Sequence, residues 1–289
     1  MAGSQTAVPV GPAAMPPDPD RSIETRFRWG FRHYLRRYGP IAVVVVNLTV
    51  FFFIWQALAV NEVINPLFLP SVTDMFGSIR DGFADGTLGA AVLWSFRHYL
   101  LGLGLACAVG IPLGLLMGAS KVVYAIFSPY MWALQSLPRV ALMPLLILFF
   151  GFTAKAEVTL IFLSAVFPIM INCMSGVKTV EPSLLRAGRV FGASRLDMYR
   201  RIIFPYTLPF ILSGVNQGLT RGLVGMVIAE IFTGKNGLGF LVQYAGNQFD
   251  TPRLYGVLLI IMVFSLCLVQ LARWVEIKAA PWRNQGIGM

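Results

Sequence analysis

The sequence predicts an all-α, polytopic membrane protein with six transmembrane helices. Of its 289 residues, 56% are hydrophobic and only 12% are charged, and the mean hydropathy is +0.70, whereas about 25% of residues are charged in a soluble domain. Barrel strands are a poor alternative, because they would alternate apolar and polar residues. Six apolar runs are long enough to cross a bilayer, which takes about 20 helical residues. They lie at residues 41–60, 99–118, 124–150, 157–176, 207–232 and 254–273.

These runs form one membrane domain, predicted at residues 40–277, with a tail at each end. The first twenty residues are rich in Ala and Pro and contain no Lys or Arg, a composition typical of disorder. Residues 1–39 are therefore predicted to be a disordered and basic tail, and residues 278–289 a second tail. The first apolar run follows six arginines and is longer than the core of a signal peptide. We interpret it as a permanent anchor.

The distribution of positive charge predicts the orientation in the membrane. In a six-span chain, sixteen Lys and Arg residues fall on the side of the two termini and five on the opposite side. Because positive residues favour the cytoplasm, both termini are expected to be cytoplasmic. The net charge of +10 is then explained by topology and by contact with membrane lipid, and no nucleic-acid partner is expected.

Two of the apolar runs carry small-residue faces that let helices approach closely. The pattern is compatible with packing inside one subunit and with an interface between subunits, and the sequence leaves both open. The glycines of the two faces, each at every fourth position, are Gly110, Gly114 and Gly118 in the second run and Gly214, Gly218 and Gly222 in the fifth.

In the third run, Pro138 and Pro144 are predicted to interrupt the helix, and a broken helix at membrane depth is typical of a pathway.

Two arginines lie inside predicted spans. Arg139 directly follows Pro138, and Arg221 lies one turn after Gln217 on the same helix face. Intramembrane arginine costs about 2.5 to 3.5 kcal/mol on insertion scales, so it usually faces a cavity or a partner. We interpret Arg139, Gln217 and Arg221 as the lining of a positive path for an anion. The alternative is a structural role, although the spacing of Arg221 and Glu230, about 13 Å along a helix, disfavours that pair.

The connection between the fourth and fifth runs contains five arginines and a central glycine. Pro182 suits a first helical turn, and Gly192 suits the left-handed residue that ends a helix. Ser194, with Asp197 three residues later, can cap a second helix, which Pro205 would close. The connection is therefore predicted to be two short helices separated by glycine.

This connection, residues 178–205, is predicted to dock on a partner. Ala187 and Gly188 leave the first helix almost without side chains at one point, while Arg186 and Arg189 remain exposed on either side. Such a surface suits a groove on another protein. The alternative is a solvated cytoplasmic loop whose arginines serve topology or contact anionic lipid.

The connection also resembles the signature of bacterial ATP-binding-cassette (ABC) importer permeases. That signature is Glu-Ala-Ala, three residues, Gly, nine residues, Ile, one residue and Leu-Pro. The matching positions here are Ala187, Gly192, Ile202 and Pro205. The departures are Arg186 in place of Glu, Gly188 in place of the second Ala, and Phe204 in place of Leu.

Other stretches resemble the sulfonate, taurine and nitrate branch of these permeases, and the resemblance covers nearly everything from about residue 40 to the C-terminal PWR. The chain is thus identified as a member of that branch, with a type I importer permease fold. The stretches are NPLFLPS at 65–71, ADGTL at 84–88, SFR at 95–97, GIPLGLLMG at 110–118, ALMPLLILFFG at 141–151, FGAS at 191–194 and GLG at 237–239.

The resemblance implies a permease subunit in the cell membrane of a bacterium. Its implied partners are a second permease copy in a homodimer, a cytoplasmic ABC ATPase dimer and an external solute-binding protein. The cargo would be a small anion of the sulfonate, taurine, nitrate or carboxylate type, although related permeases also carry neutral or cationic vitamin precursors. The connection would be a coupling helix, with docking residues Arg186, Ala187, Gly188, Arg189, Gly192, Ser194, Ile202 and Pro205.

No enzymatic activity and no cofactor are expected. The chain lacks the G-x-x-x-x-G-K-[ST] loop that cradles nucleotide phosphates, so ATP is expected to be bound and hydrolysed by the partner ATPase. The alternative from another class is an ion-coupled secondary transporter. Such a transporter would usually carry carboxylates within its spans, whereas in this chain Glu230 is nearly the only one. Cys107, Cys173 and Cys267 lack metal-ligand spacing and are predicted to be buried apolar residues.

Overall fold

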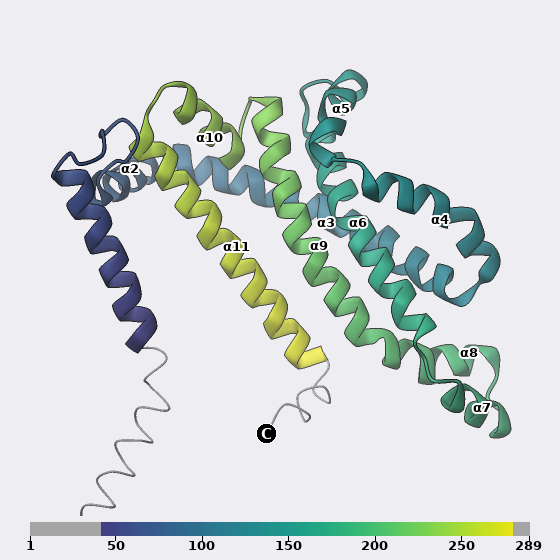
Figure 1. Cartoon of the computed structure of the whole chain (residues 1–289). Helices are drawn as coiled ribbons and strands as arrows, with labels where there is room; N and C mark the ends of the chain where they lie inside the picture. The colour runs from purple at the N-terminus through teal and green to yellow at the C-terminus, as the bar shows by residue number, and fades with distance from the viewer. Residues whose placement is uncertain (1–41, 280–289) are drawn as a thin grey trace, which may run out of the picture. The chain divides into compact units, whose positions relative to one another are not determined.

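The computed structural model describes residues 42–279, and every regular element in that range is a helix (Figure 1), as predicted. The predicted tail 1–39 and most of the tail 278–289 lie outside the described residues. The chain divides into two compact units between Asn61 and Glu62. The first unit contains the helix Ala42–Val60. The second contains α2 (Val72–Ala84), α3 (Thr87–Ala119), α4 (Lys121–Ser136), the 3-10 turn η1 (Arg139–Leu142), α5 (Met143–Phe150), α6 (Ala154–Lys178), α7 (Pro182–Val190), α8 (Arg195–Met198), the π-helical turn η2 (Tyr199–Ile203), α9 (Phe204–Thr233), α10 (Leu238–Asn247) and α11 (Thr251–Ala279).

Four of the described helices are long and apolar enough to cross a membrane, namely Ala42–Val60, α3, α6 and α11. The bent pair formed by α4 and the segment Arg139–Phe150 adds a fifth if it counts as one span. α9 has 30 residues but is not among them, because Asn216, Gln217 and Arg221 lower its hydropathy. The count of six spans therefore stays a prediction, and each predicted span coincides with a helix or with the bent pair.

The third predicted span is broken, as expected, but at one proline only. α4 ends at Ser136, and the following segment Arg139–Phe150 is bent away from it by 99°. Pro138 lies at this break as the N-cap of η1. Pro144 does not interrupt a helix, because it lies in the first turn of α5, where a missing N–H costs no helical hydrogen bond.

The core of the second unit is α6, which has its most extensive contacts with α9 and α3; in Figure 1 α3 crosses behind α6 and α9. Both predicted glycine faces pack on α6. A Cβ on Gly114 of α3 would lie 2.5 Å from the carbonyl oxygen of Met170, and one on Gly218 of α9 would lie 3.2 Å from that of Ala165. The two faces therefore serve packing inside one chain, which decides between the alternatives left by the sequence.

A hydrogen bond joins the two helices that pack on α6. Tyr99 of α3 is fully buried, and its hydroxyl donates to the carbonyl oxygen of Leu219 in α9 at 2.9 Å. The Tyr99 ring reaches α9 beside Gly222, whose added Cβ would lie 3.5 Å from it. Because glycine has no side chain, the backbones of α3, α6 and α9 lie close enough for Tyr99 of α3 to bond directly to α9.

The prediction that all three cysteines are buried is wrong for one of them. Cys173 on α6 is buried and Cys107 on α3 is half-buried, but Cys267 on α11 is exposed. α11 packs less closely than α6: 11% of its apolar window is buried, against 61% for α6.

Substitution of Gly114 by Ala tests the packing on α6. The new methyl group must displace backbone at Met170, so we expect a loss of about 1 to 3 kcal/mol in stability and a lower Tm of the detergent-purified protein. Gly104→Ala is the matched control on the same helix, because no atom lies within 4 Å of its added Cβ. Equal Tm values for the two variants would contradict the close approach of α3 and α6.

Candidate functional site

The connection between α6 and α9 forms the two short helices that the sequence predicts. Pro182 is the first residue of α7, and Gly192 has a φ of +75° in the turn that follows. Ser194 caps α8, since its Oγ accepts a hydrogen bond from the Asp197 N–H at 3.2 Å. The Ser194 hydroxyl also donates to the Asp197 carboxylate, and this bond, aided by nearby arginines, holds the pKa of Asp197 below its ordinary value.

The second short helix does not end at Pro205. α8 continues through η2 directly into α9, and Pro205 lies in the first turn of α9. Proline is tolerated there because the π-helical turn before it already departs from the regular hydrogen-bond ladder. The prediction that Pro205 closes a separate helix is therefore wrong. The connection is helically continuous with the core helix that follows it.

Gly188 faces the inside of the connection. The sequence had predicted that it lies on an exposed docking surface. An added Cβ would lie 2.5 Å from Sδ of Met198 and 2.8 Å from Cδ1 of Ile202. Gly188 and Ile202 are half-buried, whereas Ala187 is exposed. The absence of a side chain at Gly188 therefore lets α7 pack against α8 and η2.

An exposed apolar tip on this connection was missed by the sequence analysis. Val190 and Phe191, at the end of α7, are 83% and 88% exposed, and Leu196 on α8 is 66% exposed. The sequence signal was an apolar pair directly before Gly192, among residues that are otherwise polar. Exposed arginines lie within five residues of the tip along the chain, namely Arg186, Arg189 and Arg195.

The structure brings Arg139 and Arg221 together. Arg139 begins η1, which packs against α6 and α9, and its guanidinium group interacts electrostatically with that of Arg221 on α9. Within residues 42–279 neither arginine forms an ion pair. In the part of the chain that the structure describes, the buried Nε of Arg139 has no hydrogen-bond partner, and neither has the buried Oε1 of Gln135 just before the break. Two positive charges thus lie near each other without a described carboxylate to balance them.

Gln217, the third predicted path residue, lies one turn before Arg221 and is exposed. Its Nε2 lies 3.5 Å from Oδ1 of Asn172 on α6, a long hydrogen bond. The amide of Asn172 donates to the Pro168 carbonyl oxygen at 2.8 Å. Polar side chains of α9 and α6, namely Gln217 and Asn172, therefore lie about one helical turn from Arg221.

Glu230 does not pair with Arg221. It is 1% exposed, and its Oε2 accepts a hydrogen bond from the Gly239 N–H at 2.8 Å. Next to it, the Leu238 N–H donates to Oγ of Ser95 on α3 at 2.9 Å. Glu230 and Ser95 therefore hold the first turn of α10 against α9 and α3.

A second buried carboxylate, Glu157, interacts electrostatically with Glu230 and was not identified in the sequence analysis. It is 2% exposed at the start of α6 and accepts hydrogen bonds from Thr233 Oγ1 at 2.8 Å and Trp94 Nε1 at 3.2 Å. Nδ1 of His98 lies 3.4 Å from Oε2 of Glu157. Glu157 lies at the first residue of the predicted span 157–176, and both it and Glu230 are engaged in contacts between helices.

Comparison with known proteins gives the family. Residues 110–280 match the family described as binding-protein-dependent transport system inner membrane component. The taurine transport system permease protein TauC of Escherichia coli (strain K12) is 30% identical over 270 residues, covering 91% of this chain and 96% of its own. The putative aliphatic sulfonates transport permease protein SsuC of Bacillus subtilis (strain 168) is 28% identical and covers 86% and 90%. The nitrate import permease protein NrtB of Leptolyngbya laminosa is 27% identical and covers 86% and 89%.

The fold has a counterpart among solved structures. A chain of the MetNI methionine ABC transporter, in an inward-facing conformation, matches with a TM-score of 0.59 at 16% identity, covering 67% of this chain and 96% of its own. That likeness shows the fold, and the family model with the permease relatives shows that this protein is the permease subunit of an ABC importer. It belongs to the family of binding-protein-dependent inner-membrane components, in the branch of the taurine, sulfonate and nitrate permeases.

The contact between Thr233 and Glu157 can be tested by Thr233→Val, which keeps the shape and removes the hydroxyl. Leaving a buried carboxylate oxygen without this donor costs about 1 to 3 kcal/mol, so we expect a lower Tm of the purified protein. Thr220→Val on the same helix is the matched control, since the exposed Thr220 hydroxyl bonds only to the Asn216 carbonyl oxygen among the described residues. A Tm of Thr233→Val equal to that of the control would show that the contact contributes nothing.

Proposed function

We propose that this permease imports a small anion along a path that Arg139, Gln217 and Arg221 line. The supporting observation is the pair of neighbouring guanidinium groups without an ion-pair partner among residues 42–279. Arg139 is half-buried and Arg221 is exposed among the described residues; like charges repel, and a passing anion would relieve this repulsion. Guanidinium forks suit carboxylate, sulfonate and similar oxyanions.

The relatives support the same class of cargo. Their names refer to taurine, aliphatic sulfonates and nitrate, and each of these solutes carries an anionic group of oxygen atoms. A cationic vitamin precursor would be repelled by the arginine pair. An ion-coupled secondary transporter would need carboxylates that accept the coupling ion, whereas Glu157 and Glu230 hold helices together.

Substitution of Arg221 by Gln tests the anion path. It removes the charge and keeps a hydrogen-bonding side chain, and the loss of a bond to a charged group is worth about 1.5 to 3 kcal/mol. We expect uptake of the anionic substrate by reconstituted importer to fall roughly tenfold to a hundredfold, while affinity stays with the external binding protein. Arg80→Gln is the control, because Arg80 is exposed on α2 and bonds only to its neighbour Asp81 among the described residues. Wild-type uptake by an assembled Arg221→Gln importer would return Arg221 to a structural role.

The connection between α6 and α9 is the proposed contact with a cytoplasmic ABC ATPase dimer. Val190 and Phe191 form the anchor, because exposed aromatic residues that enter a pocket often dominate an interface. Among the predicted docking residues, Arg186, Ala187 and Arg189 precede the anchor on α7. The remaining ones, Gly188, Gly192, Ser194, Ile202 and Pro205, give the connection its shape. Helical continuity with α9 then provides a route from ATPase closure to the membrane path.

The orientation and the other partners complete the proposal. Sixteen Lys and Arg residues on the side of the connection, against five on the other, favour a cytoplasmic connection and cytoplasmic termini. A second copy of this chain would supply the other half of the path, and an external solute-binding protein would deliver the anion. ATP would be bound and hydrolysed by the ATPase subunits, with no cofactor on this chain.

A cysteine at the tip tests orientation and docking together. In a chain whose own three cysteines are replaced by Ala, Phe191→Cys should react with a membrane-impermeant maleimide only from the cytoplasmic side. A bound ATPase should protect it at least tenfold. Phe68→Cys is the control, because Phe68 is an exposed phenylalanine, 67% accessible, in a predicted external connection.

The two parts of this proposal fail separately. Reaction of Phe191→Cys from the external side would overturn the orientation. Reaction from the cytoplasm that is equally fast with and without the ATPase would overturn the docking site and leave the orientation intact. The Phe68 variant should react only from outside, at a rate that the ATPase does not change.

A further inference from the structure

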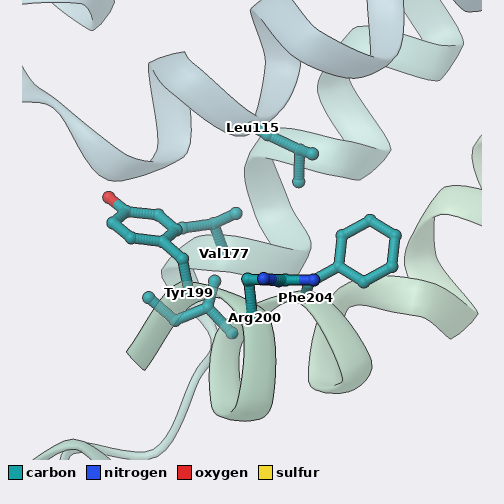
Figure 2. Close-up of a pocket in the computed structure, with 6 residues that line it drawn as sticks. Leu115, Val177, Tyr199, Arg200 and Phe204 are labelled. Carbon is teal, nitrogen blue, oxygen red and sulfur yellow. The ribbon is translucent and has the colours of Figure 1, made fainter. Parts of the chain in front are cut away.

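A cavity of about 370 Å³ lies where the connection joins the core. Leu115 near the end of α3 and Val177 near the end of α6 form one wall, and η2 with the start of α9 forms the other (Figure 2). The lining residues are Leu115, Val177, Tyr199, Arg200, Ile203 and Phe204. Most of them are apolar, and Tyr199, Arg200 and Phe204 are exposed, so the cavity is an open, largely apolar hollow.

The π-helical turn supplies half of this lining. Tyr199, Arg200 and Ile203 all belong to η2, the turn that carries α8 into α9. Turns of this kind are rare and occur frequently at functional sites. A molecule in the cavity therefore touches the joint through which movement of the connection reaches α9.

Among the described residues of the lining, Arg200 alone is charged. Figure 2 shows its guanidinium group lying within the cavity, between the side chains of Tyr199 and Phe204 and opposite Leu115 and Val177. No ion pair of Arg200 exists among the described residues, where Asp197 pairs instead with Arg201 at 3.5 Å. The cavity thus offers one positive charge within an apolar surface.

This combination selects an amphiphile with a negative head. A free phosphate ion would leave the apolar walls without contacts, and a neutral lipid would leave Arg200 without a counter-charge. Basic pockets between transmembrane helices on the cytoplasmic side bind the headgroups of anionic lipids. In the orientation proposed above, on which this step rests, the cavity lies at the cytoplasmic border of the membrane.

We propose that the cavity binds one anionic phospholipid of the cytoplasmic leaflet. The phosphate pairs with the Arg200 guanidinium, and an acyl chain packs on Leu115, Val177, Ile203 and Phe204. The lipid then supports the joint between connection and core from inside the cavity. ATP hydrolysis that responds to the binding protein accordingly depends on anionic lipid.

The test uses the complete importer in lipid nanodiscs of phosphatidylcholine with or without phosphatidylglycerol. Binding of phosphatidylglycerol is measured by native mass spectrometry and by titration, and ATP hydrolysis is measured with the binding protein present. We expect Arg200→Gln to weaken phosphatidylglycerol binding roughly tenfold, since it removes a charge-assisted hydrogen bond. Leu115→Trp fills the cavity and should abolish binding while keeping Arg200. Arg273→Gln is the control, because it removes an exposed positive charge from α11, outside the lining.

Each outcome decides the proposal. Wild-type affinity for phosphatidylglycerol in both cavity variants would overturn it. So would an equal effect of inorganic phosphate added to phosphatidylcholine nanodiscs, or a segment of protein found in the cavity of the assembled importer. Loss of the lipid response in the variants, with import retained in mixed lipid, would support the site and leave the proposed transport function standing. Absence of ATP-driven import by the wild-type chain in every lipid would contradict the transport function, whereas the binding titration would still judge the lipid site.

Discussion

The close packing of α3 and α9 on α6 is the constraint on which the rest of the structure depends. Glycines on α3 and α9 bring backbones within reach of each other, because a single Cβ at Gly114 would already meet the Met170 carbonyl oxygen at 2.5 Å. Both ends of α6 are thereby positioned. At one end Glu157 meets Trp94 and Thr233, and at the other end α7 begins a few residues after Lys178.

The charged groups in the membrane region differ in how they are compensated. Glu157 and Glu230 are almost fully buried and accept hydrogen bonds from side chains and backbone that hold α3, α6, α9 and α10 together. Arg139 and Arg221 lie near each other without such partners among the described residues. The two carboxylates therefore hold helices together, while the two arginines are the residues of the proposed anion path.

The connection and α9 form one continuous helical segment through the π-helical turn η2. The segment does not end at Pro205, because α8, the π-helical turn η2 and α9 follow one another without a break, and α9 carries Gln217 and Arg221. The absence of a side chain at Gly188 lets α7 pack on Met198 and Ile202, so the two short helices contact each other directly. The cavity beside this turn is lined by residues of η2, α3, α6 and α9, so the proposed lipid would contact both the connection and the core.

The sequence alone predicted the local features of this protein. Only the tertiary structure showed which residues from different helices contact each other. The all-α class, the break at Pro138, the start of α7 at Pro182, the left-handed Gly192 and the Ser194 cap each depend on residues within one helical turn or on the length of an apolar run. The inward side of Gly188, the fate of Pro205, the partners of Glu157 and the meeting of Arg139 with Arg221 depend on contacts between distant residues. Such contacts are set by the rotation and tilt of whole helices, and a one-dimensional pattern carries the faces of each helix but not the neighbour that each face meets.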